Sequence, residues 1–122
     1  LLKRQEIAAK YNQELKSLPI VLPWQHSDAY SAYHLYVICL KLDKIRKTHK
    51  QIFEELRQVG IGVNLHYIPV HTQPYYQKLG FGWGDFQVSE HYYSTAISIP
   101  MYPALTDAEQ DRVITTLKEV II

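Results

Sequence analysis

Two imidazoles, a phenol and a carboxamide lie close together in one short stretch of this chain. They belong to His66, Tyr67, His71 and Gln73, and Pro69 separates the two histidines. Imidazole, phenol and carboxamide groups can all take part in directional hydrogen bonds, so this set is suited to binding a polar ligand. A segment with a purely structural role has little use for such a combination.

The residues around this set predict a strand that ends in a loop. Residues 63–68 alternate between apolar and other side chains, the period of a short strand with one buried face. Pro69 cannot donate to a ladder, so the strand must end or lie at a sheet edge there. Residues 70–73 then form a loop beyond a strand end, a common place for sites. We expect His66 and His71 to face one cleft.

The other elements predict an α+β fold. Helical stripes, apolar runs and turn residues predict a helix at 1–18, a strand at 33–40, a helix at 45–59 ended by Gly60, a helical turn at 73–79, a helix at 85–96, a strand at 97–99 and a helix from 107. We expect Asp85 to cap its helix, with Val88 and Tyr92 inward, and Thr106 and Glu109 to form a capping box. The prediction is a two-layer sandwich: a three-stranded, mainly antiparallel sheet with helices packed mainly on one face.

Composition describes one ordinary globular domain. The chain has 122 residues, of which 47% are hydrophobic and 20% charged, with a formal net charge of +1. No basic run predicts binding to nucleic acid, and no apolar run reaches the roughly 18 residues of a membrane span. A single cysteine, Cys39, leaves no internal disulfide. We therefore expect a cytoplasmic protein with neither a nucleic-acid partner nor a membrane partner.

Each candidate residue also has a structural interpretation. His66, on a half-buried strand, fits a structural histidine at least as well as a ligand-binding one. Tyr67 alternates with apolar residues and therefore fits core packing, and Gln73 fits the start of a helix. The residue types alone do not decide between these interpretations and a binding site.

A metal site is the chemical alternative. His66 and His71, together with His91 or Asp85, could supply three nitrogen or oxygen ligands. Their spacing matches no strong zinc signature. The expectation is therefore that no metal binds here.

Six segments resemble the C-terminal part of the DegT/DnrJ/StrS family, pyridoxal-phosphate (PLP) aminotransferases that act on nucleotide-linked keto-sugars. They occur in family order and together span essentially the whole chain. The segments are residues 6–11, 33–36, 52–56, 60–71, 73–76 and 105–110. Within the family the chain looks most like the branch that aminates C4 of UDP-linked 4-keto-6-deoxy-N-acetylhexosamines.

The resemblance implies a function and a set of partners. Such enzymes are homodimers in which a lysine of the large domain forms an aldimine with PLP, and glutamate typically donates the amino group. By the resemblance, His66, Tyr67, His71 and Gln73 line the cleft between the small and large domains and orient the nucleotide sugar. No residue of this chain is expected to be catalytic.

One departure from the family pattern limits this expectation. The family lysine lies in a serine-x-x-lysine setting, and no serine here has a lysine three residues later. We therefore expect residues 1–122 to be the small domain of a larger enzyme, inactive alone and binding no PLP by itself. The absence of an initiator methionine and of a capping residue before the first helix agrees with this expectation. The alternative is a stand-alone α+β binding or dimerisation module without catalytic activity.

Overall fold

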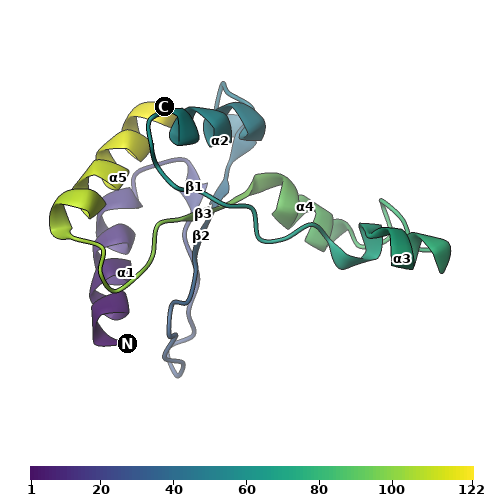
Figure 1. The fold of residues 1–122 in the computed structure, drawn as a ribbon, viewed down its shortest axis with the longest axis horizontal. Coiled ribbons are helices and arrows are strands. Elements are labelled where there is room, and N and C mark those ends of the chain that lie inside the picture. The colour runs from purple at the N-terminus through teal and green to yellow at the C-terminus, as the bar shows by residue number, and fades with distance from the viewer.

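The computed structural model describes all residues, 1–122, as an α+β body from which one arm projects (Figure 1). In chain order the elements are α1 (Leu2–Leu15), β1 (Ile20–Val21), β2 (Tyr36–Leu40), the 3-10 turn η1 (Leu42–Lys44), α2 (His49–Gln58), the 3-10 turn η2 (Val70–Thr72), α3 (Pro74–Lys78), α4 (Gln87–Thr95), β3 (Ala96–Ile99) and α5 (Asp107–Val120). None of the helices has the length and apolar character that crossing a membrane requires.

The sheet has three antiparallel strands in the order β1-β2-β3. Tyr36 at the start of β2 pairs with Ile99 of β3, and Leu40 at its end pairs with Ile20 of β1. The β2 strand is therefore the central one of the three. This arrangement confirms the predicted three-stranded antiparallel sheet.

Helices cover one face of this sheet. Alternate residues of β2, namely Tyr36, Ile38 and Leu40, are buried, whereas the two residues between them are only half-buried. The ring of Tyr11 on α1 packs at 4.9 Å from the ring of Tyr36, and α5 packs against both α1 and α2. The buried apolar side chains of the sheet and of these helices form one core, which confirms the two-layer α+β prediction.

Local sequence signals fix the ends of the two helices that flank the pocket described below. α2 begins at Thr48 and α5 at Thr106, and in both the hydroxyl accepts from the backbone of Gln51 or Glu109 in a reciprocal capping box. After α2 the chain turns at Gly60, whose φ of +85° is readily available only to glycine. The predicted cap of α5 and the predicted stop of α2 are both confirmed.

The third strand is not the one that the sequence predicts. Residues 63–68 contribute only one bridge, in which Asn64 exchanges two backbone hydrogen bonds with Ser98 of β3, at 3.1 and 2.8 Å. The third strand is β1, two residues that the sequence analysis left outside any strand. After Asn64 the chain turns away from β3 and runs outward into the arm. The alternating apolar residues that follow therefore have no neighbouring strand to pair with.

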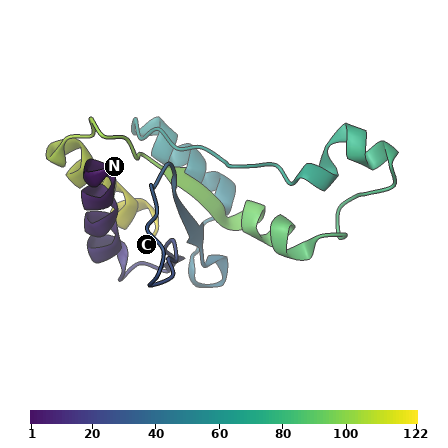
Figure 2. The same cartoon turned by 90° about the horizontal axis from the view of Figure 1, so that it is seen from below.

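The arm, residues 67–92, extends from the body and contains η2, α3 and most of α4 (Figures 1 and 2). Along the arm no second layer faces α4, and Val88 is 87% exposed rather than inward as predicted. Tyr92 is also exposed, so this part of the prediction is wrong. Asp85 does not cap α4 either, because its carboxylate accepts a hydrogen bond from the Gly82 amide at 2.8 Å.

Candidate functional site

A pocket of about 430 Å³ lies in the body where the residue 60–66 segment passes β3 and α5. His66 lines it, and its Nδ1 lies 2.7 Å from the hydroxyl of Ser98. The backbone bridge between Asn64 and Ser98 holds the two segments together directly beside this contact. Other polar residues reach the same pocket from three further segments: His34, Tyr102, Glu109 and Arg112.

Two of the charged groups in this body pocket are already engaged by the fold. The guanidinium of Arg112 donates to the carbonyl of Val59, and the Glu109 carboxylate accepts from the Thr106 amide in the capping box. A side-chain carbon at Gly60 would lie 3.3 Å from the Arg112 guanidinium, so glycine fits both the turn and this contact. The imidazoles are therefore the groups of the pocket that are best placed to meet a ligand.

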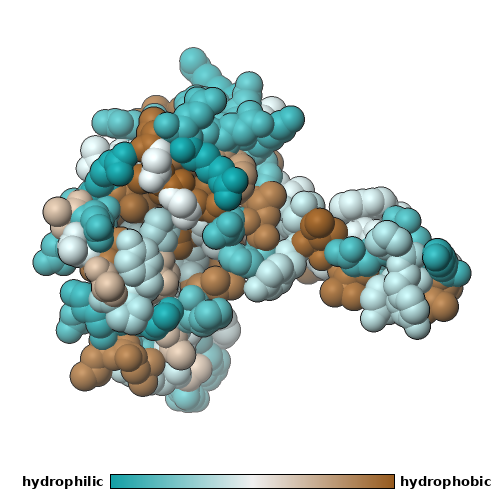
Figure 3. All heavy atoms as spheres, in the orientation of Figure 1, coloured by the Kyte–Doolittle hydropathy of each residue, from teal (hydrophilic) through white to brown (hydrophobic).

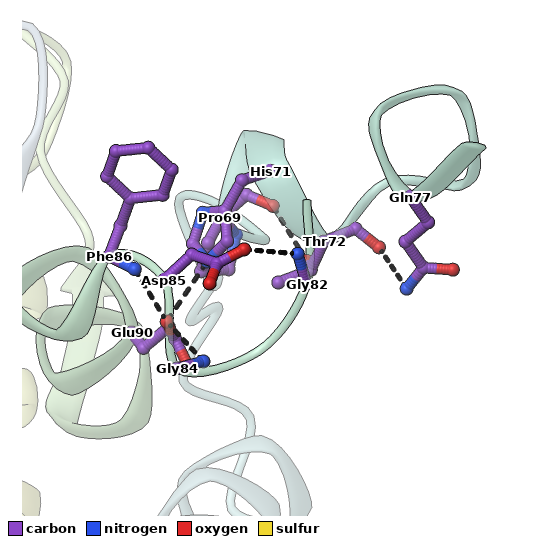
Figure 4. Close-up of polar contacts among 9 residues, drawn as sticks. All are labelled: Pro69, His71, Thr72, Gln77, Gly82, Gly84, Asp85, Phe86 and Glu90. Atoms are coloured by element: carbon purple, nitrogen blue, oxygen red, sulfur yellow. Dashed lines mark hydrogen bonds and ion pairs between the residues drawn. The ribbon is translucent and has the colours of Figure 1, made fainter. Parts of the chain in front are cut away.

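His71 lies in the arm and is almost completely buried there. Its Nε2 lies 3.0 Å from Oε2 of Glu90 (Figure 4). The same carboxylate accepts hydrogen bonds from the amides of Gly84, at 2.7 Å, and of Phe86, at 3.2 Å. The Gly84 amide, followed by His71 and the Phe86 amide, holds the pKa of Glu90 below its ordinary value. Glu90 is therefore a carboxylate at neutral pH.

The His71 ring forms one wall of a second pocket, which we call the arm pocket. Its volume is about 380 Å³. The Phe86 ring is tilted against the imidazole at a centroid distance of 4.8 Å, and Phe81 packs on Phe86 at 6.1 Å. The remaining lining residues are Val70, Tyr76 and Ser89. The arm pocket is thus mainly aromatic, and its polar side-chain groups are the imidazole of His71 and the hydroxyls of Tyr76 and Ser89.

Tyr67 and Gln73 line neither of these pockets. The Tyr67 side chain is 69% exposed, and its ring meets the ring of His66 edge-on at 4.6 Å. The peptide bond between these two residues is cis. Gln73 is exposed at the start of α3, where its side chain makes no capping hydrogen bond. Both side chains are free to meet a ligand or another polypeptide surface.

The structure therefore separates the residues that the sequence places together. His66 and Tyr67 lie at the junction of body and arm, whereas His71 lies in the arm and faces a different pocket. The predicted common cleft is not formed by this chain alone. No group of three histidine, cysteine or acidic side chains is close enough to hold a metal ion, so the metal alternative has no support.

Two residues that contact the candidate histidines could not be identified from the sequence. Ser98 lies in a strand that reads as apolar, and its pairing with His66 depends on a non-local bridge. Glu90 had a local signal, because an acidic residue in the first turn of a helix can bind the free amides at the helix start. Its partnership with His71 depends on the path of the arm, which has no such signal.

Comparison with known proteins gives a consistent result across sequence and structure. Residues 1–118 match the model of the DegT/DnrJ/EryC1/StrS aminotransferase family. The chain is 34% identical over 122 residues to the spore coat polysaccharide biosynthesis protein SpsC of Bacillus subtilis, with 98% of this chain and 31% of SpsC covered. The chain therefore spans about a third of the length of this curated relative.

Two solved structures have the same fold as this chain. One is PseC of Helicobacter pylori, an aminotransferase involved in the biosynthesis of pseudoaminic acid, with a TM-score of 0.86 and 26% identity over 98% of this chain and 32% of PseC. The other is DesV of S. venezuelae in complex with a ketimine intermediate, with a TM-score of 0.85 and 28% identity. That match covers 96% of this chain and 30% of DesV.

Proposed function

Because the chain belongs to the DegT/DnrJ/EryC1/StrS aminotransferase family, we propose that it is the small domain of a PLP-dependent nucleotide-sugar aminotransferase. The enzyme transfers an amino group, typically from glutamate, to a keto-sugar, and works as a homodimer. The family match over residues 1–118 is the observation that carries this proposal. The similarity to SpsC and PseC, whose names refer to polysaccharide and pseudoaminic acid biosynthesis, supports a sugar substrate.

The residues of this chain do not fit PLP by themselves. The cofactor needs a lysine for its carbonyl carbon and a group of donors for its phosphate. Neither the body pocket nor the arm pocket is lined by a lysine. Lys10, Lys47 and Lys118 are paired with acidic side chains elsewhere on the surface. The proposal therefore assigns cofactor binding and the chemical step to residues outside this chain.

This chain contributes binding and orientation of the substrate. His66 presents an imidazole that Ser98 holds in place, and the exposed ring of Tyr67 can pack on a sugar or a base. The exposed Gln73 amide can donate to phosphate or hydroxyl oxygens. The ring of His71 lines the arm pocket. The finer proposal, based on the resemblance of the sequence to the C4-aminating branch of the family, is that the substrate is a UDP-linked 4-keto-6-deoxy-N-acetylhexosamine aminated at C4.

The first test is made on the polypeptide that carries this domain in its natural host. We expect its intact mass to be about three times that of the 14.3 kDa chain, in keeping with the coverage of SpsC. We also expect a yellow absorbance band that bleaches when glutamate is added. A colourless protein of 14.3 kDa would contradict the proposal and favour a stand-alone binding module.

The second test concerns the binding residues. In the complete enzyme, His66→Ala should raise the KM for the keto-sugar about tenfold, the effect of losing a hydrogen bond worth up to about 1.5 kcal/mol. The cofactor absorbance should not change. His26→Ala, at an exposed histidine of the loop before β2, is the matched control and should behave as wild type. Loss of cofactor binding in His66→Ala would refute the assigned role.

A further inference from the structure

The carboxylate of Glu90 holds the imidazole of His71 from one side. The two side chains are largely buried, with 15% of Glu90 and 8% of His71 exposed. Oε2 of Glu90 lies 3.0 Å from Nε2 of His71 and also accepts from the amides of Gly84 and Phe86 (Figure 4). The carboxylate is therefore fixed by the backbone before it contacts the ring.

This contact determines where the imidazole carries its proton. A carboxylate can only accept hydrogen bonds, so a ring nitrogen that faces it must donate. The amides of Gly84 and Phe86 stabilise the ionised form of Glu90, which keeps it an acceptor at neutral pH. A neutral His71 is consequently held in the tautomer with the proton on Nε2, and its lone pair lies on Nδ1.

Nδ1 of His71 remains available to a ligand. It forms no hydrogen bond with any protein group. Every fully buried side-chain nitrogen or oxygen in the molecule has a hydrogen-bond partner, so Nδ1, which has none, must be partly exposed. The ring that carries it lines the arm pocket. The ring with this unpaired nitrogen thus lies among the aromatic side chains that line the pocket.

We propose that Glu90 is a positioning residue, which holds His71 so that Nδ1 accepts a hydrogen bond from a hydroxyl or N–H group of a ligand in the arm pocket. The inference rests on the proposed function for the identity of that ligand, a nucleotide sugar, which carries hydroxyl and base N–H donors. Glu90 is not one of the proposed substrate-binding residues, because it acts only through His71.

The first experiment measures the tautomer of His71 by nitrogen NMR of the 122-residue chain at alkaline pH. The wild-type ring should carry its proton on Nε2. Glu90→Gln replaces the charged acceptor by an amide, whose oxygen is a weaker acceptor and whose NH2 group can only donate, so the tautomer ratio should fall about tenfold toward the Nδ1–H form. Glu54→Gln, at an exposed glutamate paired with Lys50 on α2, is the matched control and should leave the ratio unchanged. An unchanged ratio in Glu90→Gln would overturn the proposal.

The second experiment separates positioning from support of the fold, using the complete enzyme. As a positioning change, Glu90→Gln should raise the KM for the keto-sugar about tenfold while kcat stays near wild type. If Glu90 only supported the fold, less active enzyme would form, so the maximal rate would fall at unchanged KM. That pattern would overturn the proposal.

A variant of the histidine completes the test. His71→Gln keeps a donor that can reach Glu90 but removes the ring acceptor, so it should raise KM as much as Glu90→Gln. Adding Glu90→Gln to His71→Gln should then change KM no further, because the two residues act as one unit. Additive effects would contradict the proposal. If the wild-type enzyme aminates no keto-sugar, the proposed function fails, whereas the tautomer measurement still decides the role of Glu90.

Discussion

The body and the arm of this molecule are held together in different ways. The body contains the whole hydrophobic core, a cluster of 23 buried residues from the sheet, α1, α2, α5 and the loops between them. In the arm only Pro69, His71 and Thr72 are buried. Large apolar and aromatic side chains lie on its surface instead: Tyr67, Ile68, Val70, Tyr75, Tyr76, Leu79, Phe81, Trp83, Phe86, Val88 and Tyr92. Figure 3 shows brown, hydrophobic patches on the arm among paler spheres.

The arm is held in its conformation mainly by hydrogen bonds, whereas the body is held by its buried core. The hydroxyl of Thr72 donates to the carbonyl of Pro69 at 2.7 Å, Gln77 donates to the carbonyl of Thr72 at 2.9 Å, and Glu90 joins His71 to the loop before α4 (Figure 4). Such a region opens more easily than a packed core. Of the two candidate histidines, His71 therefore lies in the region that opens more easily, whereas His66 lines the body pocket.

The largest expected difference in stability is between two leucine-to-alanine substitutions, one in the body and one in the arm. Leu117 of α5 is fully buried, and Leu117→Ala should lower the free energy of unfolding by about 2–5 kcal/mol. Leu79 of the arm is 60% exposed, and Leu79→Ala should change it by less than about 0.5 kcal/mol. Urea unfolding followed by circular dichroism measures both. Equal losses would show that the arm shares the stability of the body.

A smaller effect should follow the loss of a helix cap. Thr106→Ala removes the hydroxyl that accepts from the Glu109 amide, and should lower the free energy of unfolding by about 1 kcal/mol. Thr106→Ser keeps the hydroxyl and serves as the control, with a stability close to that of the wild type. α4 begins at Phe86 without a side-chain cap of its own, so the difference between body and arm extends to the helix ends. Equal stability of the Ala and Ser variants would contradict this account.

Most of the body could be predicted from the sequence because its signals are local. The apolar stripe of α5, the capping box at Thr106 and the stop at Gly60 each depend on residues within a few positions of one another. β1 was missed because two residues are too few to show a period. The strand predicted at residues 63–68 has the right alternation but finds only one partner, Ser98, and strand pairing is not a local property.

The sequence groups the candidate residues in one short stretch, but their arrangement in space could not be predicted from it. The motif places His66 and His71 close in sequence, yet between them the chain leaves the body and enters the arm. Val88 was expected inward because a helical stripe normally faces a core, and along the arm there is no core for it to face. The contact of Glu90 with His71 likewise depends on the path of the arm, which no periodicity encodes.

The next effect should be confined to the arm. Glu90→Ala removes the acceptor of the Gly84 and Phe86 amides, and should speed hydrogen exchange in the arm on the order of tenfold. Amides of β2 in the body should exchange at the wild-type rate. Mass spectrometry of peptides after deuterium labelling measures both regions in one sample. Faster exchange in β2 as well would show that the two regions open together.

The smallest effect is the pH dependence of the same contact. Hydrogen bonds from Gly84, His71 and Phe86 lower the pKa of Glu90 below the ordinary glutamate value of 4.5. A carboxyl group whose pKa is lower in the folded state stabilises that state above its unfolded pKa, and this contribution is lost as the pH falls through the folded pKa. The arm should therefore loosen below about pH 4.5.

The amide signals of Gly84 and Phe86 report this transition directly in NMR spectra recorded as a function of pH. In the wild-type chain both signals should shift together with a midpoint below 4.5, because both amides donate to the same carboxylate. In Glu90→Gln the shift should disappear, since no carboxyl group remains there to take up a proton. A wild-type midpoint at or above 4.5 would mean that Glu90 is not held by these amides in solution. The arm would then lack the polar anchor that distinguishes it from the body.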